Sequence, residues 1–163
     1  MGTKSAHLQL RMTPAQKTAL RRAAERAGQG MSAFVLARVL PPARLRVGEL
    51  LAAVANDATC RYALAELNDM LAELPPAEFR AAVAEPPATA LSPYSRNYVA
   101  AMIEHAAHQK GVEPPAWLAT VPSLDEPRFA SSLGGLRLHL LTASPVAFRR
   151  RNIFIDSTIG DRV

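Results

Sequence analysis

Apolar and polar residues alternate near the start of the chain, in the stretch Ala-His-Leu-Gln-Leu-Arg-Met at residues 6–12. Successive side chains of a strand point to opposite faces, so this alternation predicts a strand with one apolar side and one polar side. The apolar side holds Leu8, Leu10 and Met12, and the polar side holds His7, Gln9 and Arg11. One strand cannot bury its apolar face alone, so we expect an identical strand from a second chain to pair with it and helices to cover its back.

A helix start follows this strand directly. Thr13 is a suitable N-cap, Pro14 suits the first helical position, and Gln16 completes a capping box. Apolar residues recur with helical spacing up to residue 27, and Gly28 then supplies the left-handed conformation that ends many helices. Ser32 predicts the cap of a second helix, which the prolines at 41 and 42 end. A strand, a helix, a turn and a second helix therefore occupy about forty residues.

Prolines divide the rest of the chain into short pieces. There are 13 prolines, and most of them follow residue 40. Apolar periodicity predicts helices over 43–57, 60–73, 76–84 and 93–110, a linker over 85–93, a short helix around 136–141 and a strand at 153–155. We expect a mainly α fold with three parts, namely an N-terminal module at 1–42, a helical connector at 43–85 and a proline-punctuated region at 86–163.

Charge is distributed unevenly along the chain. The net charge is +5, made of +7 in residues 1–50, −4 in residues 51–85 and +2 in residues 86–163. Positive charge is thus concentrated in the strand–helix–helix segment, as a nucleic-acid-binding module requires. A solvent-exposed basic surface is the alternative interpretation.

The number of cysteines and the hydropathy of the chain indicate the cellular compartment in which we expect it. Cys60 is the only cysteine, so no intrachain disulfide can form, which favours a reducing cytoplasm. No apolar run approaches the ~18 residues that a membrane span requires, so we expect no contact with a membrane.

The stretch LQLRMTPAQKTALRRAAERAGQGMSAFVLARVL, residues 8–40, resembles the ribbon-helix-helix proteins of the Arc/MetJ/CopG type. These are DNA-binding repressors, and among them the stretch is most similar to antitoxins that accompany acetyltransferase toxins. The resemblance implies a homodimer whose two strands form an intermolecular antiparallel ribbon in the major groove. It implies a dimer core built from the apolar residues of the strand and both helices, which are Leu8, Leu10, Met12, Leu20, Phe34, Val35 and Val39.

The same resemblance implies the residues that contact DNA. The outward positions His7, Gln9 and Arg11 would contact bases, because Arg pairs with guanine and Gln with adenine in the major groove. Backbone amides at Gly30, Met31 and Ser32, with Lys4 as a further contact, would bind phosphate. The alternatives are a solvent-exposed strand face and a Ser32 that only caps its helix.

The long C-terminal part departs from that family, whose short members have only a brief toxin-binding tail. Its last segment, LDEPRFASSLGGLRLHLLTASPVAFRRRNIFIDS at residues 124–157, loosely resembles C-terminal regions of antitoxins paired with nucleotidyltransferase-like toxins. Aromatic and Arg residues are common anchors of interfaces, so we expect a protein toxin to contact Trp117, Phe129, Phe148, Arg149, Arg150, Arg151 and Phe154. The alternatives are an ordinary helical domain with these aromatics in its own core and a solvent-exposed run of Arg. An extended arm along a partner's sheet is the expectation for residues 152–155.

No catalytic or metal-binding pattern stands out. His105 and His108 have a spacing that can bind metal, but no third ligand is evident beyond Glu104, so surface histidines are the expectation. We expect no enzyme activity and no cofactor. The sequence therefore predicts an antitoxin of a type II toxin-antitoxin system that also represses transcription. The rivals are a stand-alone repressor whose C-terminal domain senses a ligand or oligomerises, and a scaffold protein whose ribbon serves only for dimerisation.

Overall fold

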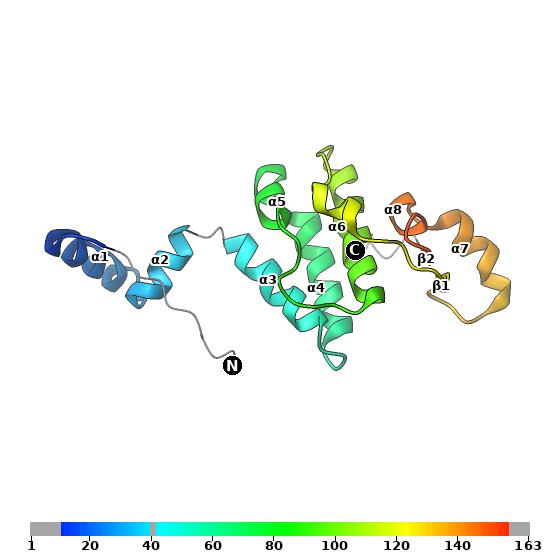
Figure 1. The fold of residues 1–163 in the computed structure, drawn as a ribbon, viewed down its shortest axis with the longest axis horizontal. Coiled ribbons are helices and arrows are strands. Elements are labelled where there is room, and N and C mark those ends of the chain that lie inside the picture. The colour runs from blue at the N-terminus through cyan, green and yellow to red at the C-terminus, as the bar shows by residue number, and fades with distance from the viewer. Residues whose placement is uncertain (1–10, 40–41, 157–163) are drawn as a thin grey trace. The chain divides into compact units, whose positions relative to one another are not determined.

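The structure is a computed structural model that describes residues 11–39 and 42–156. The chain divides into two compact units, Met1–Leu40 (unit 1) and Pro41–Val163 (unit 2). Both units are mainly helical, as the sequence predicts (Figure 1). The expected ribbon strand lies almost entirely outside the described residues, and Arg11 and Met12, its last two positions, are not in a strand.

Unit 1 contains the two predicted helices, α1 (Pro14–Arg26) and α2 (Met31–Val39). The capping box is confirmed, because Thr13 Oγ1 accepts a hydrogen bond from the Gln16 amide and Gln16 Oε1 accepts one from the Thr13 amide. Gly28 adopts the predicted left-handed conformation, with φ of +65°. The expected cap at Ser32 is wrong. Helix α2 already begins at Met31, and the Gly30 carbonyl accepts the first helical hydrogen bond, from the Phe34 amide at 2.9 Å.

Unit 2 begins with four helices, α3 (Pro42–Val54), α4 (Cys60–Glu73), α5 (Pro76–Val83) and α6 (Pro93–Gln109). Their bounds agree with the predicted ranges to within a few residues. The largest difference is at the end of α3, where Asn56 Oδ1 accepts a hydrogen bond from the Ala58 amide. Such a local side-chain bond offers the backbone an alternative to the helix and ends it early.

Helix α6 forms the centre of unit 2 (Figure 1). It packs against α4 and α8 (Val146–Arg149), and most of its residues from Ser95 to Ala107 are buried. A helix that is buried on all sides must be covered by several elements at once. Residues 43–85, expected as a connector, and residues of the region after 86 therefore share one hydrophobic core.

The C-terminal elements are short. They are η1 (Ala116–Thr120), β1 (Arg128–Phe129), η2 (Gly134–Leu136), α7 (Arg137–Ala143), α8 and β2 (Ile153–Phe154). The predicted short helix and C-terminal strand are confirmed as α7 and β2. The expectation that this strand lies along a partner's sheet is wrong, since β2 pairs in parallel with β1 of its own chain, Phe129 beside Phe154.

Tyr98 on α6 offers a test of this packing through pH. Its ring lies between Tyr94 and Phe148, with centroid distances of 5.8 and 5.4 Å. Burial raises the pKa of Tyr98 to about 12, and the nearby Tyr94 adds to the rise. Because the pKa in the unfolded chain is about 10, the folded chain holds this proton more tightly between pH 10 and 12.

We expect the stabilisation from Tyr98 to be complete below pH 10 and to be lost as the pH rises to about 12, by up to about 1.4 kcal/mol per pH unit. Tyr98→Phe removes this loss, while Tyr62→Phe, at an exposed position, retains it. Urea denaturation at several pH values measures the effect. If the free energy of unfolding fell equally steeply with pH in Tyr98→Phe and in the unaltered chain, the burial of the Tyr98 hydroxyl would be contradicted.

Candidate nucleic-acid interface and partner-binding surface

The described part of unit 1 leaves most of its apolar side chains partly or fully exposed. Of its described residues, Ala24 alone is buried. Among the residues predicted for the dimer core, Leu20, Phe34 and Val35 are half-buried, Met12 is 37% exposed and Val39 is 70% exposed, while Leu8 and Leu10 lie outside the described residues. A unit of about forty residues with so little core usually needs a second chain to be stable.

The surface of unit 1 is strongly basic. Arg11 is exposed, and so are the basic residues of α1, which are Lys17, Arg21, Arg22 and Arg26. The one acidic residue in the described part of this unit is Glu25. Arg38 lies over the Phe34 ring, with its guanidinium carbon 5.0 Å from the ring centroid. Of the other residues predicted to contact DNA, Lys4, His7 and Gln9 lie outside the described residues.

The predicted phosphate contacts lie at the start of α2. Gly30 and Ser32 are exposed, and Met31 is half-buried. The first backbone amides of a helix have no acceptor within that helix and point along its axis. The start of α2 therefore presents donors of the kind that bind an anion. Although Ser32 does not cap the helix, it remains within this first turn.

The residues predicted to bind a protein partner fall into two groups. Phe148 and Arg151 are 4% and 6% exposed, and the half-buried Trp117 donates a hydrogen bond from Nε1 to the Val83 carbonyl at 2.9 Å. These three side chains contribute to the core of unit 2, which corresponds to the alternative of an ordinary helical domain. The rings of Phe129 and Phe154, both half-buried, stack on each other at 4.9 Å, and Arg149 and Arg150 are exposed.

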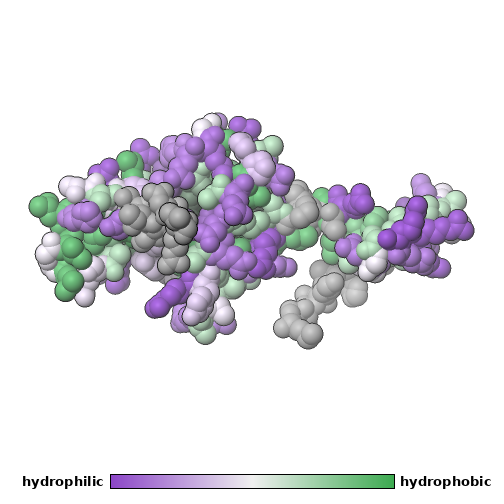
Figure 2. All heavy atoms as spheres, turned by 180° about the vertical axis from the view of Figure 1, so that it is seen from behind, coloured by the Kyte–Doolittle hydropathy of each residue, from purple (hydrophilic) through white to green (hydrophobic). Residues whose placement is uncertain are grey.

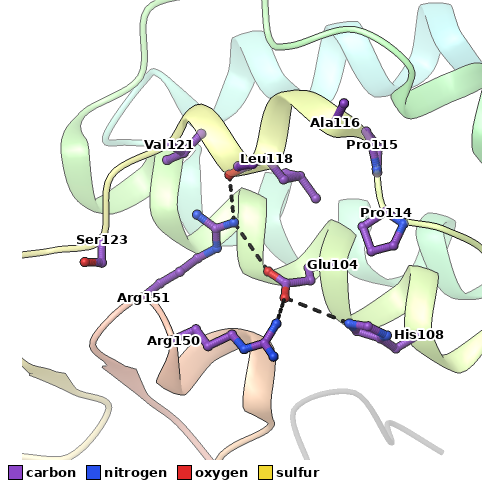
Figure 3. A pocket seen from close by; sticks show the side chains of 11 residues that line it. Glu104, His108, Pro114, Pro115, Ala116, Leu118, Val121, Ser123, Arg150 and Arg151 are labelled. Atoms are coloured by element: carbon purple, nitrogen blue, oxygen red, sulfur yellow. Dashed lines mark hydrogen bonds and ion pairs between the residues drawn. The ribbon is translucent and has the colours of Figure 1, made fainter.

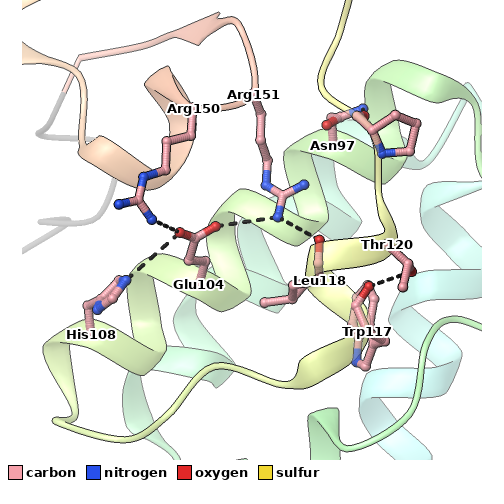
Figure 4. Close-up of polar contacts among 9 residues, drawn as sticks. Asn97, Glu104, His108, Trp117, Leu118, Thr120, Arg150 and Arg151 are labelled. Carbon is pink, nitrogen blue, oxygen red and sulfur yellow. Dashed lines mark hydrogen bonds and ion pairs between the residues drawn. The ribbon is translucent and has the colours of Figure 1, made fainter.

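Glu104 on α6 connects two of these arginines (Figure 4). Its carboxylate accepts hydrogen bonds from Arg150 at 3.2 Å and from Arg151 at 3.4 Å. Arg151 also donates to the Leu118 carbonyl of η1 at 3.2 Å, so one guanidinium links α6, η1 and the turn before β2. The side chains of Glu104 and Arg151 are only 11% and 8% exposed, whereas that of Arg150 is 67% exposed. The inner pair is a buried ion pair, and Arg150 closes it from the solvent side.

A cavity of about 410 Å³ lies beside this cluster (Figure 3). Its lining includes Glu104, Arg150 and Arg151, with His108 on the next turn of α6. His108 is more than half exposed, and its Nε2 is 3.9 Å from Glu104 Oε1. With two arginines against one carboxylate, the polar wall of the cavity has a net positive charge, which suits a small anionic group.

Sequence reasoning did not assign a role to Glu104. Its position among apolar residues of a long helix was the available signal, because a charge on a buried face needs a partner. The partner itself is 47 residues further on, and nothing local predicts that contact. Within the described residues, no group of three or more metal-binding side chains occurs.

The buried ion pair should contribute strongly to the stability of unit 2. We expect Glu104→Gln to lower the free energy of unfolding by about 3 kcal/mol, because it leaves the Arg151 charge buried without a counter-charge. Arg150→Gln should change it by less than about 1 kcal/mol, since that side chain is largely exposed. Urea denaturation followed by the fluorescence of Trp117, the single tryptophan, measures both. If Glu104→Gln and Arg150→Gln lowered the free energy of unfolding equally, the distinction between the buried Glu104–Arg151 pair and the exposed Arg150 would be wrong.

Comparison with known proteins gives one match. Residues 7–59 match a family model described as Antitoxin TacA 1-like, which covers about a third of the 163 residues. The match includes unit 1 from residue 7 onward and continues through α3 of unit 2. No curated protein and no solved structure shows a significant match. Within the described residues, no helix is both long enough and apolar enough to cross a membrane. The family match supports an antitoxin.

Proposed function

We propose that this protein is the antitoxin of a type II toxin-antitoxin system, a homodimer that binds DNA and represses its own transcription. The observation that carries the proposal is the match of residues 7–59 to an antitoxin family. The nearly coreless unit 1 supports the dimer, because a second copy would cover Met12 and Val39. The exposed basic residues of α1 and the amides at the start of α2 support binding to DNA.

In this proposal the N-terminal segments of two chains pair as a ribbon in the major groove. His7, Gln9 and Arg11 contact bases, and Lys4 with the amides of Gly30, Met31 and Ser32 contacts phosphates. The other residues predicted for the dimer core lie between the two chains, and these are Leu8, Leu10, Leu20, Phe34 and Val35.

Unit 2 then provides the surface that neutralises a co-encoded toxin. It has a core of its own, so it can present a surface of fixed shape to a partner. The role is that of a binding protein that needs neither catalysis nor a cofactor. We place this activity in the cytoplasm, where a single cysteine remains reduced.

One observation favours a second candidate function. The positively charged cavity beside Glu104, Arg150 and Arg151 suits a stand-alone repressor that senses a small anionic ligand. Co-expression with the product of the adjacent gene separates the two proposals. A stoichiometric complex that relieves growth inhibition supports the antitoxin, and the absence of any complex supports the stand-alone repressor.

Arg11→Ala tests recognition of DNA by the ribbon. We expect binding to the DNA upstream of the chain's own gene to weaken by about 5- to 150-fold for each lost contact, the equivalent of ~1–3 kcal/mol. Affinity should also fall steeply with salt, as it does whenever several phosphates are contacted. Fluorescence anisotropy measures both effects, and sedimentation checks that the dimer persists.

Arg61→Ala is the matched control, because Arg61 is an exposed arginine of α4 in unit 2. It should bind this DNA as tightly as the unaltered chain. If Arg11→Ala also retained full affinity as an intact dimer, base recognition by this strand would be wrong and the ribbon would serve for dimerisation alone.

A further inference from the structure

Helix α7 and the residues that lead into it carry exposed leucines. Leu133 is 65% exposed, Leu136 43%, Leu138 74% and Leu141 42%. Figure 2 shows hydrophobic side chains gathered at the end of unit 2 that α7 forms, at the left of this view. Isolated exposed leucines are ordinary, but four within nine residues form a patch of the kind that marks an interaction site.

The position of each leucine on α7 follows from helical geometry. Leu140 is 4% exposed and is the buried residue of this helix. At about 100° per residue, Leu138 lies roughly 160° around the helix from Leu140 and Leu141 roughly 100°, so the two exposed leucines share a side turned away from Leu140, one turn apart from each other. We call this side the outer face. A helix that is apolar on both sides is normally covered on both sides, and among the described residues of this chain only the Leu140 side is buried.

The polar side chains of α7 are engaged by unit 2 itself. The Thr142 hydroxyl donates to the carbonyls of Leu138 and His139 within the helix. His139 Nε2 is 3.1 Å from the Asp156 carboxylate, and the Ser144 hydroxyl at the helix end donates to the Ile155 carbonyl. Hydrogen bonds therefore fix the orientation of α7 while its outer leucines remain exposed.

One arginine lies on α7 with these leucines and another lies beside an exposed valine of α8, and neither has an acidic partner among the described residues. Arg137 is one helical turn from Leu141, and on α8 Arg149 is one turn from Val146, which is 51% exposed. In the described part of the chain, neither arginine forms a salt bridge. The Arg137 guanidinium is instead held over the Phe129 ring at 5.3 Å. An occupant of the outer face would thus meet leucines with the Arg137 guanidinium one turn away, while the Asp156 carboxylate is engaged by His139.

We propose that the outer face of α7 is the surface through which unit 2 binds a protein partner that presents an apolar patch flanked by carboxylates. This inference rests on the proposed function, in which the partner is the toxin. It assigns the contact to Leu138, Leu141 and Arg137, and not to Trp117, Phe148 and Arg151, which the core of unit 2 already uses.

Charge and chemistry argue for this occupant. A second copy that docked symmetrically through the same face would offer Arg137 no carboxylate from α7, whose sequence RLHLLTA contains no acidic residue. A nucleic acid would satisfy the arginines but would leave the leucines against a phosphate backbone. A protein surface with apolar and acidic residues satisfies both.

The test uses the full chain and the purified product of the adjacent gene. The double variant Leu138→Glu/Leu141→Glu should bind that protein more than about 30-fold more weakly, because it places charge where an apolar contact is buried. Arg137→Glu should slow association and abolish its salt dependence. Calorimetry and stopped-flow fluorescence measure these changes, and circular dichroism checks the fold.

Two exposed residues of α4 provide the controls. Tyr62→Glu matches the introduction of charge at an exposed apolar residue, and Arg61→Glu matches the charge reversal. Both should bind like the unaltered chain. Binding of the α7 variants at the level of these controls would overturn the inference while leaving the antitoxin proposal intact.

Other outcomes also decide the matter. Failure of the unaltered chain to bind the product of the adjacent gene would overturn both proposals. Loss of self-association in the α7 double variant, with partner binding unchanged, would assign the face to a second copy and overturn the inference. Exposure of α7 amides to hydrogen exchange only after removal of residues 157–163 would assign it to the chain's own end, with the same consequence.

Discussion

The burial of most of α6 between Ser95 and Ala107 is the constraint on which unit 2 depends. A helix with so little exposed surface can be satisfied only if elements before and after it in the chain cover it together. This requirement joins α3–α5 and the short C-terminal elements into one core. It also places Glu104 where water cannot compensate its charge, so that Arg151 must do so, and the Leu118 carbonyl accepts a second hydrogen bond from the same guanidinium.

The two units bury their apolar side chains to different extents. Unit 2 has enough chain to enclose its own apolar residues, among them Phe79 and Leu67, which are fully buried. Unit 1 has two short helices, and in its described part only Ala24 is enclosed. A small unit gains most from a second copy, because the ratio of surface to volume is least favourable there. This difference fits a protein in which one unit dimerises and the other presents a formed surface.

The C-terminal part of unit 2 shows that only some of the residues expected to contact a partner remain exposed in the fold. Phe148, within α8, and Arg151, two residues after this helix, are enclosed because both contact α6. Leu138 and Leu141 have equal or greater hydrophobicity but lie on the side of α7 turned away from Leu140. Residue type alone does not separate these side chains. Their positions in the fold decide which are buried in the core and which stay exposed and can contact a partner.

The sequence alone determined what depends on near neighbours. The capping box of Thr13 and Gln16, the left-handed Gly28 and the bounds of α4 and α6 follow from side chains a few residues apart and from apolar spacing. The tertiary structure alone decided the pairing of β1 with β2, the contact of Glu104 with Arg151 and the exposure of the outer face of α7. The physical reason is that hydrogen bonds within a helix or turn join residues close in sequence, whereas burial and ion pairing join residues that only the folded chain brings together.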